Sequence, residues 1–203
     1  MSGILYIIAA PSGAGKTSLV NALISSTPQI QLSISHTTRA PRPAERDGQH
    51  YFFVNDETFL QMAKAHSFLE HARVFDFWYG TSKEWVLQQL TIGFDVILEI
   101  DWQGAQQIKR LHPDTVMIFI FPPSIAVLAQ RLRQRGQDDE AVIERRLAEA
   151  RLEMSHYQEY DYLVVNDDFD TALSELKCII GAERLRQKVQ GIKKKELIAE
   201  LLL

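Results

Sequence analysis

Residues 10–17, with the sequence Ala10-Pro-Ser-Gly-Ala-Gly-Lys-Thr17, constrain the fold of this chain more than any other segment. They follow an apolar run at 4–9 that is typical of a buried strand, and they precede a helical pattern at 18–24. A strand, a glycine-rich loop and a helix in this order form the context that a phosphate-binding loop requires. Ala10 replaces the first glycine of the G-x-x-x-x-G-K-[ST] pattern, a change that an ordinary backbone conformation tolerates. The segment therefore predicts a P-loop nucleotide-binding core.

The residue types in this loop suit a chain of phosphates. Gly13 and Gly15 can adopt backbone angles that are closed to other residues, so that successive N–H groups can point at one anion. The start of the following helix adds the positive end of its dipole. We expect Lys16 to reach the β- and γ-phosphates and the Thr17 hydroxyl to bind Mg²⁺.

Length and composition indicate one globular domain with small inserts. The chain has 203 residues, of which 46% are hydrophobic and 24% are charged. No apolar run approaches the length of a membrane span, no signal sequence precedes the first strand, and the net charge of −4 argues against a protein that coats nucleic acid. The single cysteine, Cys178, cannot form an internal disulfide, and its apolar neighbours suggest that it packs in the core. We therefore expect a cytoplasmic protein without a nucleic-acid or membrane partner.

Apolar runs rich in β-branched residues predict strands, and helical patterns such as 103–111 and 124–135 separate most of them. The runs cover residues 4–10, 30–35, 94–100, 115–121 and 161–166. Strands that alternate with helices require crossover connections, which produce a parallel sheet covered on both faces. The sequence predicts an α/β fold, namely a P-loop NTPase core with a five-stranded parallel sheet flanked by helices.

Two stretches interrupt this alternation. Residues 36–88 hold arginine, proline, glycine and aromatic residues in short segments, which indicates a small inserted subdomain. Residues 124–154 are helical and highly charged, with a break at 136–139, which indicates a helical lid. The core then consists of residues 1–35, 89–123 and 155–203, the last part including a C-terminal helix.

Arg39 and Arg42 lie in a segment that two prolines stiffen. Pro41 and Pro43 favour polyproline II, which has three residues per turn, so both arginines would project from the same side. Two guanidinium groups on a stiff backbone suit a phosphate. A solvated basic loop is the alternative, and this segment alone does not choose between the two.

Arginines also concentrate in the predicted lid, at Arg131, Arg133, Arg135, Arg145 and Arg146. Arg131 and Arg135 are four residues apart, and such a like-charge pair costs a helix roughly 0.2–0.5 kcal/mol unless an anion lies between them. These arginines could neutralise a transferring phosphoryl group. They could instead pair on a solvated face with Asp138, Asp139, Glu140 or Glu144.

Three acidic residues are candidates for base recognition or metal binding. Glu99 and Asp101 stand two apart at the end of the predicted strand 94–100, where open α/β sheets bind ligands. Glu70 lies in the inserted region, and a carboxylate there could accept both N1–H and the 2-amino hydrogen of guanine, although a surface acid is the alternative. Thr81-Ser-Lys-Glu84 matches a capping box that opens a helix at 82–90.

The remaining signals are weaker. The six histidines show no paired ligand spacing, so we expect no zinc site. Residues 193–203 carry an apolar stripe that could dock on the core or form a homo-oligomer, and the sequence does not choose between these.

Taken in order, the motifs APSGAGKT, SHTTRAPR, DGQHYFF, FLEHARV, WYGTS, ILEIDWQGA, RLRQRG, ERRL and VVNDD closely resemble the guanylate kinase family, its bacterial members in particular. The resemblance extends from the first strand to about residue 190. It implies a core, an inserted small α+β nucleotide-binding subdomain that binds GMP, and a helical lid. It also implies transfer of the ATP γ-phosphoryl group to GMP or dGMP with Mg²⁺. The alternatives are a related P-loop kinase acting on a sugar phosphate and a non-catalytic guanylate-kinase-like binding module.

The resemblance also implies roles for residues at the matching positions. The ATP-binding residues would be Ala10, Pro11, Ser12, Gly13, Ala14, Gly15, Lys16, Thr17 and Ser18, with Asn166 near the adenine. The GMP phosphate would contact Arg39, Arg42, Tyr51 and Tyr79, and guanine would contact Ser35, Glu70, Thr81 and Asp101. The catalytic cations would be Lys16, Arg39, Arg131, Arg135 and Arg146. Thr17 would bind Mg²⁺, and Glu99, where many relatives have aspartate, could contribute through a water molecule.

Overall fold

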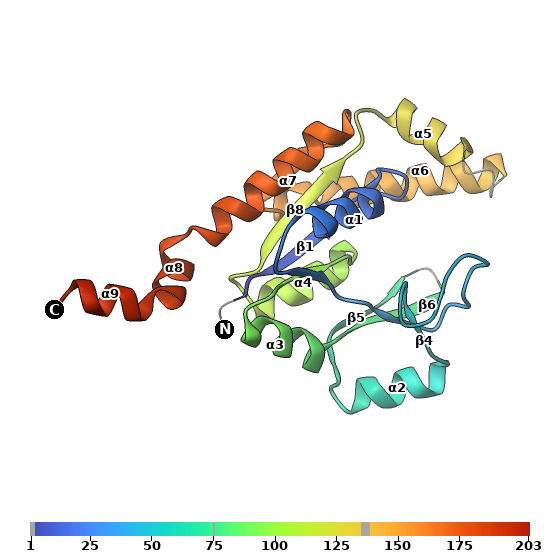
Figure 1. Ribbon diagram of the computed structural model, residues 1–203. Coiled ribbons are helices and arrows are strands. Elements are labelled where there is room, and N and C mark those ends of the chain that lie inside the picture. The colour runs from blue at the N-terminus through green and yellow to red at the C-terminus, as the bar shows by residue number, and fades with distance from the viewer. Residues whose placement is uncertain (1–2, 75, 135–138) are drawn as a thin grey trace. The chain divides into compact units, whose positions relative to one another are not determined.

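The computed structural model describes residues 3–74, 76–134 and 139–203 (Figure 1). The chain divides into two compact units. The first unit contains residues 3–7 and 31–115, and the second contains residues 8–30 and 116–203. The first strand of the chain contributes residues to both units.

The strands of the main sheet confirm the predicted α/β core. They are β1 (Leu5–Ala9), β2 (Ile30–Leu32), β7 (Asp95–Leu98), β8 (Val116–Phe121) and β9 (Tyr162–Val165), in the order β2-β7-β1-β8-β9. β1 is parallel to β7, and β8 is parallel to β9. Each strand lies inside one of the apolar runs, and β1 and β7 are buried along their whole length, as strands of a covered parallel sheet are.

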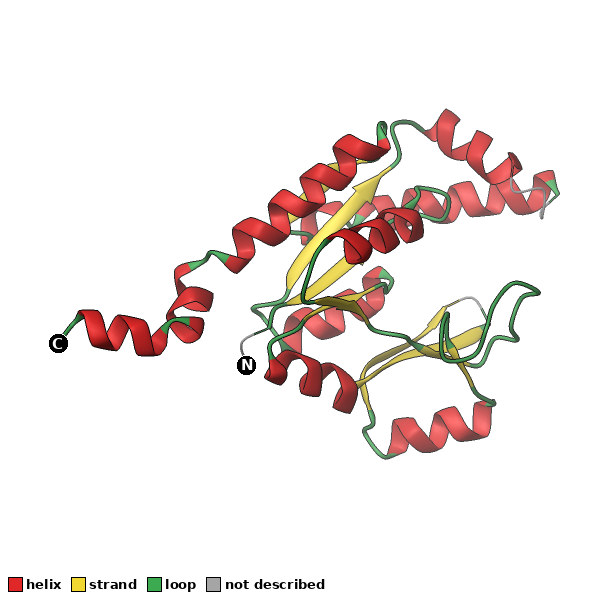
Figure 2. Ribbon diagram, viewed as in Figure 1, coloured by secondary structure: helices red, strands yellow, loops and turns green. Residues whose placement is uncertain are grey.

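The first unit adds a smaller sheet made of β3 (His36–Thr37), β4 (Phe52–Phe53), β5 (Phe68–Val74) and β6 (Phe77–Ser82), in the order β4-β3-β6-β5. β5 and β6 are antiparallel. Phe68 pairs with Ser82 whereas Glu70 pairs with Thr81, so Leu69 is an extra residue that forms a bulge in β5. Figure 2 shows the helices of this unit beside its strands: α2 (Asp56–Lys64), α3 (Lys83–Ile92) and α4 (Trp102–Leu111). All three helices contact β5.

The second unit is mainly helical around β8 and β9. Its helices are α1 (Lys16–Ser26), α5 (Ile125–Gln134), α6 (Glu140–Ser155), a short 3₁₀ helix (Tyr157–Glu159) and α7 (Phe169–Arg184). α7 packs against α1 and β9. α5 and α6, which form the predicted lid, share a small apolar core of Leu128, Leu132, Ile143 and Ala150.

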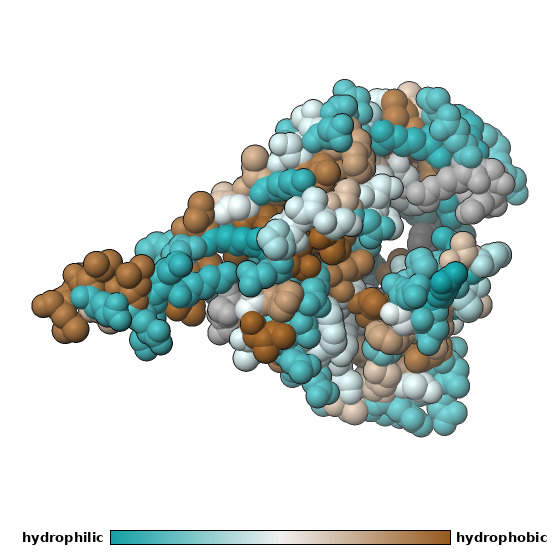
Figure 3. Space-filling view, viewed as in Figure 1, coloured by the Kyte–Doolittle hydropathy of each residue, from teal (hydrophilic) through white to brown (hydrophobic). Residues whose placement is uncertain are grey.

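The C-terminal helices α8 (Gln187–Lys193) and α9 (Lys195–Leu201) carry the apolar stripe that the sequence indicates. Its side chains are exposed, as Figure 3 shows for the end of the chain: Ile192, Leu197, Ile198, Leu201, Leu202 and Leu203. The stripe is therefore not buried against the core in this structure. Across the described part of the chain, no helix combines the length and the hydropathy that a bilayer crossing requires.

Two predictions of local structure are wrong. α3 begins after Ser82, whose hydroxyl accepts the Trp85 N–H at 3.5 Å, so the helix cap is one residue later than Thr81. Cys178 is exposed on α7 rather than packed in the core. The buried face of α7 carries Leu176 and Ile180, and a residue midway between two positions four apart points to the other side of a helix.

Candidate functional site

The loop between β1 and α1 has the backbone geometry of a phosphate cradle. Gly13 and Gly15 have φ angles of 94° and 93°, a region that favours glycine. Gly15 is the N-cap of α1, and no side chain caps this helix end. Lys16 is half-buried in the first turn, and Thr17 is exposed beside it. An anion placed here would meet backbone N–H groups and the positive end of the helix dipole.

Two side chains of the second unit support this loop from its carbonyl side. The Asn166 amide donates to the Ala14 carbonyl at 2.7 Å. The Arg131 guanidinium donates to the Ala14 carbonyl at 3.4 Å and to the Asn166 carbonyl at 3.2 Å. A Cβ on Gly15 would overlap the Asn166 amide. Asn166 and Arg131 thus donate to backbone carbonyls of the loop and of Asn166 itself, and their contacts with adenine and phosphoryl oxygens stay predictions.

Helix α5 of the predicted lid also contacts the loop through apolar side chains. A Cβ on Gly13 would lie 3.0 Å from Leu128 and 3.2 Å from Leu132. These leucines belong to the small core that α5 and α6 share. The loop and the lid are therefore packed together, which a pattern of charges along the sequence could not indicate.

The structure tests the ion-pairing interpretation for two of the arginines in the predicted lid, and the phosphoryl-binding interpretation stays a prediction. Arg133 pairs with Glu140, and Arg145 pairs with Glu149, both on the exposed face of the lid. For these two arginines the structure shows ion pairing with acids of the lid. Arg146 is half-buried in α6. Arg135 lies outside the described residues.

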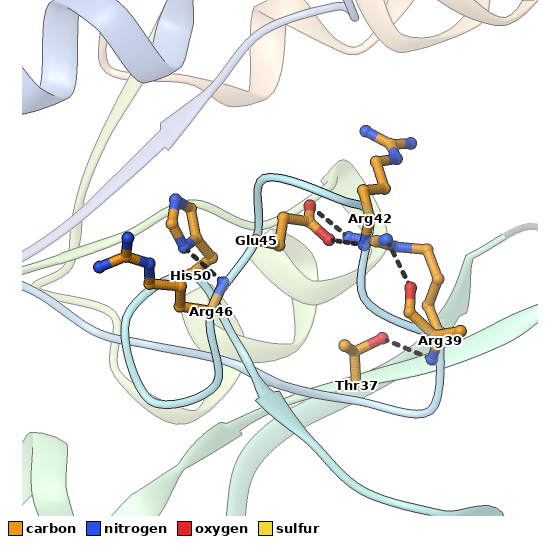
Figure 4. A network of polar contacts seen from close by, with 7 residues as sticks. Thr37, Arg39, Arg42, Glu45, Arg46 and His50 are labelled. Carbon is orange, nitrogen blue, oxygen red and sulfur yellow. Dashed lines mark hydrogen bonds and ion pairs between the residues drawn. The ribbon is translucent and has the colours of Figure 1, made fainter.

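Arg39 is the centre of a polar cluster in the first unit (Figure 4). Its guanidinium pairs with Glu45 at 2.7 Å and lies 5.4 Å from the Tyr51 ring and 5.9 Å from the Phe53 ring. The hydrogen bond to Glu45 raises the pKa of Arg39 and lowers that of Glu45. The rings of Tyr51 and Tyr79 are 5.9 Å apart. The structure thus brings together three of the four residues predicted to hold a phosphate.

Glu45 is a residue of this cluster that the sequence analysis missed. Its carboxylate occupies the Arg39 guanidinium and also accepts the Arg42 N–H at 2.8 Å. An acid six residues after Arg39 gives no periodic signal in a loop, so only the fold reveals the pair.

The polyproline conformation predicted for residues 39–42 stays a prediction, and the structure shows that Arg42 begins a turn. Its carbonyl accepts the Glu45 N–H at 2.9 Å, which closes a turn with Pro43 at the second position. Proline fixes an angle that suits a turn as well as an extended helix. The Arg42 side chain is exposed and extends away from the Arg39–Glu45 pair (Figure 4).

Glu70 is 5% exposed, so the alternative of a surface acid is wrong. Its Oε1 accepts the Thr81 hydroxyl at 2.6 Å. Burial raises the pKa of Glu70 to about 7, the Thr81 hydrogen bond opposes this rise, and the charge of Asp101 adds to it. Both Leu69 and Glu70 are buried because the bulge interrupts the alternation of side chains along β5. A buried carboxyl group that titrates near neutrality is typical of a functional site.

Asp101 and Glu99 lie beyond the end of β7 at Leu98, so their placement on the strand is wrong. Asp101 is the N-cap of α4, and its Oδ1 accepts the Gly104 N–H at 2.9 Å. Among the described residues, Oε1 of Glu99 is buried without a hydrogen-bond partner. Ser35 lies near the small sheet, where its carbonyl accepts the Phe52 N–H at 2.9 Å.

A parallel sheet whose first strand leads through a Gly-x-Gly-Lys-Thr loop into a helix defines a nucleotide-binding protein of the P-loop class. Residues 2–183 match the family model described as Guanylate kinase. The guanylate kinase of Hahella chejuensis is 61% identical over 191 residues, which are 94% of this chain and 92% of that protein. The guanylate kinase of Escherichia coli (strain K12) is 58% identical over 202 residues, which are 98% of both chains.

A solved structure agrees with these sequence relatives. The crystal structure of guanylate kinase from Anaplasma phagocytophilum matches with a TM-score of 0.78 and 33% identity, over 91% of this chain and 88% of that chain. The chain belongs to the guanylate kinase family. It is therefore a phosphotransferase of the nucleoside-monophosphate kinase type.

Proposed function

We propose that this protein transfers the γ-phosphoryl group of ATP to GMP or dGMP with Mg²⁺, giving ADP and GDP or dGDP. Family membership supports the reaction class, and the buried pair of Glu70 and Thr81 supports guanine as the base. A carboxylate accepts both N1–H and the 2-amino hydrogen of guanine, whereas N1 of adenine is an acceptor and is repelled. This buried carboxylate is the observation that carries the choice of acceptor, with Ser35 and Asp101 completing the contacts to the base.

The acceptor phosphate would bind at the cluster around Arg39. The guanidinium is held over aromatic rings and pairs with a carboxylate, so its surroundings suit an oxyanion. The phosphate would replace Glu45 as the partner of Arg39. Tyr51, Tyr79 and Arg42 would supply further donors to the phosphate oxygens.

On the donor side, ATP would lie on the phosphate loop, with Lys16 at the β- and γ-phosphates and Asn166 beneath the loop. Mg²⁺ prefers oxygen ligands and keeps several water molecules. The exposed Thr17 hydroxyl and the unpartnered Oε1 of Glu99 fit such a ligand set, the latter through water. When bound, the metal would neutralise charge on the ATP phosphates.

The reaction requires positioning and charge neutralisation rather than a protein nucleophile. An ionised oxygen of the GMP phosphate attacks the γ-phosphorus in line, and a new P–O bond forms. The bond from the γ-phosphorus to the β–γ bridging oxygen breaks, and ADP leaves. The cations that would neutralise or orient the reacting groups are Lys16, Arg39, Arg131, Arg135 and Arg146. Closure of the lid would exclude water, which otherwise accepts the phosphoryl group.

This proposal assigns residues 36–88 to GMP binding, 124–154 to the lid and the remainder to the core. The separate small sheet and the apolar core shared by α5 and α6 support these boundaries.

The exposed thiol of Cys178 suits a reducing compartment, which supports a cytoplasmic location. The exposed apolar stripe of α8 and α9 supports a homo-oligomer, which light scattering on the full chain at two concentrations would test.

An assay of ADP formation with ATP against GMP, dGMP, AMP and ribose 5-phosphate tests the proposed function. We expect kcat/KM for GMP and dGMP to exceed that for AMP by roughly 10⁴-fold, because AMP leaves a buried carboxyl group opposed to an acceptor. Turnover of the sugar phosphate alone would support the related kinase instead. Binding of GMP without turnover would support a non-catalytic binding module.

A further inference from the structure

Helix α4 packs against β5, the strand that carries Glu70 (Figure 1). Gly104 and Gln107 are three residues apart on α4, so they lie on the same side of the helix. The proposed function uses neither residue. Both act on β5 at adjacent positions, Glu70 and His71.

The Gln107 side chain forms two hydrogen bonds with the backbone of β5, and we call this pair of bonds the clamp. Its side-chain amide donates to the His71 carbonyl at 3.0 Å, and its Oε1 accepts the His71 N–H at 3.4 Å. β5 is an edge strand of the small sheet, so its outer backbone groups have no neighbouring strand to bind. The amide side chain replaces that missing strand at the residue immediately after Glu70.

Gly104 provides room for the Glu70 carboxylate. A Cβ on Gly104 would lie 2.7 Å from Oε2 of Glu70 and 3.2 Å from its Cδ, so that the carboxylate would have to shift from its observed position. Gly104 does not have a positive φ, so backbone conformation does not require glycine here. Glycine in a helix interior is less favourable than alanine, because it loses more backbone entropy on folding. The absence of a side chain at this position is therefore explained by the approach of Glu70.

Three contacts consequently restrict the position of the Glu70 side chain. The Thr81 hydroxyl bonds to Oε1 at 2.6 Å, Gly104 lies against Oε2, and Gln107 holds the backbone of the next residue. A carboxylate that must meet two donors of one base needs a fixed depth and orientation, since hydrogen bonds weaken steeply with misalignment. The α4 face supplies part of this constraint.

We infer that Gly104 and Gln107 are positioning residues that hold the Glu70 carboxylate in register with guanine and thereby set base discrimination. The inference rests on the proposed function, in which Glu70 reads the base. Neither residue touches the reacting atoms. Their effect on KM for GMP depends on the presence of Glu70, whereas an effect on folding would not depend on it.

A double-mutant cycle between Gly104→Ala and Glu70→Ala tests the inference on the full chain. In the presence of Glu70, the added methyl group displaces the carboxylate, and we expect KM for GMP to rise roughly ten- to a hundredfold. KM for ATP should stay unchanged. In the Glu70→Ala background the methyl group has room, so Gly104→Ala should then change KM for GMP less than twofold.

Gly181→Ala is the matched control, because Gly181 lies in α7 and a Cβ there meets no atom within 4 Å. It should leave the KM values for both substrates unchanged. An equal rise in KM for GMP with and without Glu70 would overturn the inference, and so would no rise at all. If the wild-type protein does not phosphorylate GMP, the proposed function fails instead, and the two failures are thus distinguishable.

The clamp allows an independent test that does not crowd Glu70. Gln107→Glu keeps the size of the side chain and the acceptor for the His71 N–H, but it places an oxygen against the His71 carbonyl. We expect a roughly three- to tenfold loss in the ratio of kcat/KM for GMP to that for IMP, because both donors of guanine depend on the carboxylate position. Gln88→Glu makes the same charge change at an exposed position of α3. Equal GMP-to-IMP ratios in the two variants would contradict a positioning role for Gln107.

Discussion

The hydroxyl of Thr81 on β6 donates to Oε1 of Glu70 on β5 at 2.6 Å, and both side chains are buried. The two residues are paired across the strands immediately after the bulge at Leu69. Among the described residues, the hydrogen-bond partner of this buried carboxyl group is a neutral hydroxyl, and burial raises the pKa of the group to about 7. The choice of substrate base, the pH dependence of GMP binding and the pH dependence of stability are therefore all expected to depend on Glu70.

Glu70→Gln is expected to lower kcat/KM for GMP by roughly one to two decades. The amide replaces one acceptor by a donor, which would face the donors of guanine and leave a buried group unpaired at a cost of about 1–3 kcal/mol. Activity on IMP, which keeps N1–H but lacks the 2-amino group, should fall less. Steady-state kinetics with GMP, IMP and AMP measure this. Identical losses with GMP and IMP would mean that another residue, such as Ser35 or Asp101, reads the 2-amino group.

KM for GMP is expected to rise as the pH falls below about 7. The free protein protonates Glu70 near this pH, and the protonated group presents a donor where guanine needs acceptors. Below the pKa the rise should approach tenfold per pH unit, and GMP binding near pH 7 should release protons. Calorimetry in buffers of different ionisation enthalpy measures the release. Because a phosphate also titrates near pH 6, Glu70→Gln is the control, and an unchanged proton release in that variant would contradict Glu70 as the source.

The same ionisation predicts a pH-dependent stability. The pKa of Glu70 is about 7 in the folded protein, against an ordinary value of 4.5 for a glutamate side chain in water. Between these values the folded state binds more protons than the unfolded state, so the free energy of unfolding falls as the pH rises, by about 3 kcal/mol in total. Glu70→Gln removes this loss. Its Tm should exceed that of the wild type at pH 8, and the difference should shrink towards pH 5. A pH-independent difference would assign the effect to packing.

Lys16→Met should abolish most phosphoryl transfer while GMP binding stays nearly intact. Lys16 belongs to the phosphate loop of the second unit, whereas the predicted GMP contacts belong to the first. Loss of a preorganised cation at developing charge costs roughly 10²–10³ in kcat. Single-turnover kinetics and GMP titration measure the two effects. Lys177→Met, on the exposed side of α7, is the control, and near-normal turnover of Lys16→Met would refute the phosphate-loop role.

Arg42→Ala should raise KM for GMP and lower kcat with little effect on ATP affinity. The Arg42 side chain is exposed and extends from the turn that Glu45 closes, so it can meet a phosphate. A charge-assisted contact is worth about 1.5–3 kcal/mol, or roughly one to two decades in affinity. Arg46→Ala removes an equal charge from the same exposed loop and serves as the control. Weaker ATP binding with unchanged GMP binding would place the acceptor site elsewhere.

Conformational preferences of neighbouring residues account for the parts of the fold that could be predicted from the sequence. The strand, the Gly13 and Gly15 turn and the start of α1 follow from neighbouring residues, because glycine angles and apolar runs act over a few positions. The parallel sheet follows from the alternation of strands with helices. The motifs then identified the family before any contact was visible.

Only the tertiary structure decided which partners the polar residues have. The hydrogen bond from Thr81 to Glu70 and those between Gln107 and His71 depend on elements that pack side by side. The ion pair of Arg39 with Glu45 depends on how one loop folds back on itself. The bulge at Leu69 leaves two consecutive side chains, Leu69 and Glu70, buried in β5, and the sequence contains no periodic signal for such a bulge. Burial then sets the pKa of that carboxyl group, because desolvation depends on every neighbour that excludes water and not on the residues beside it in the chain.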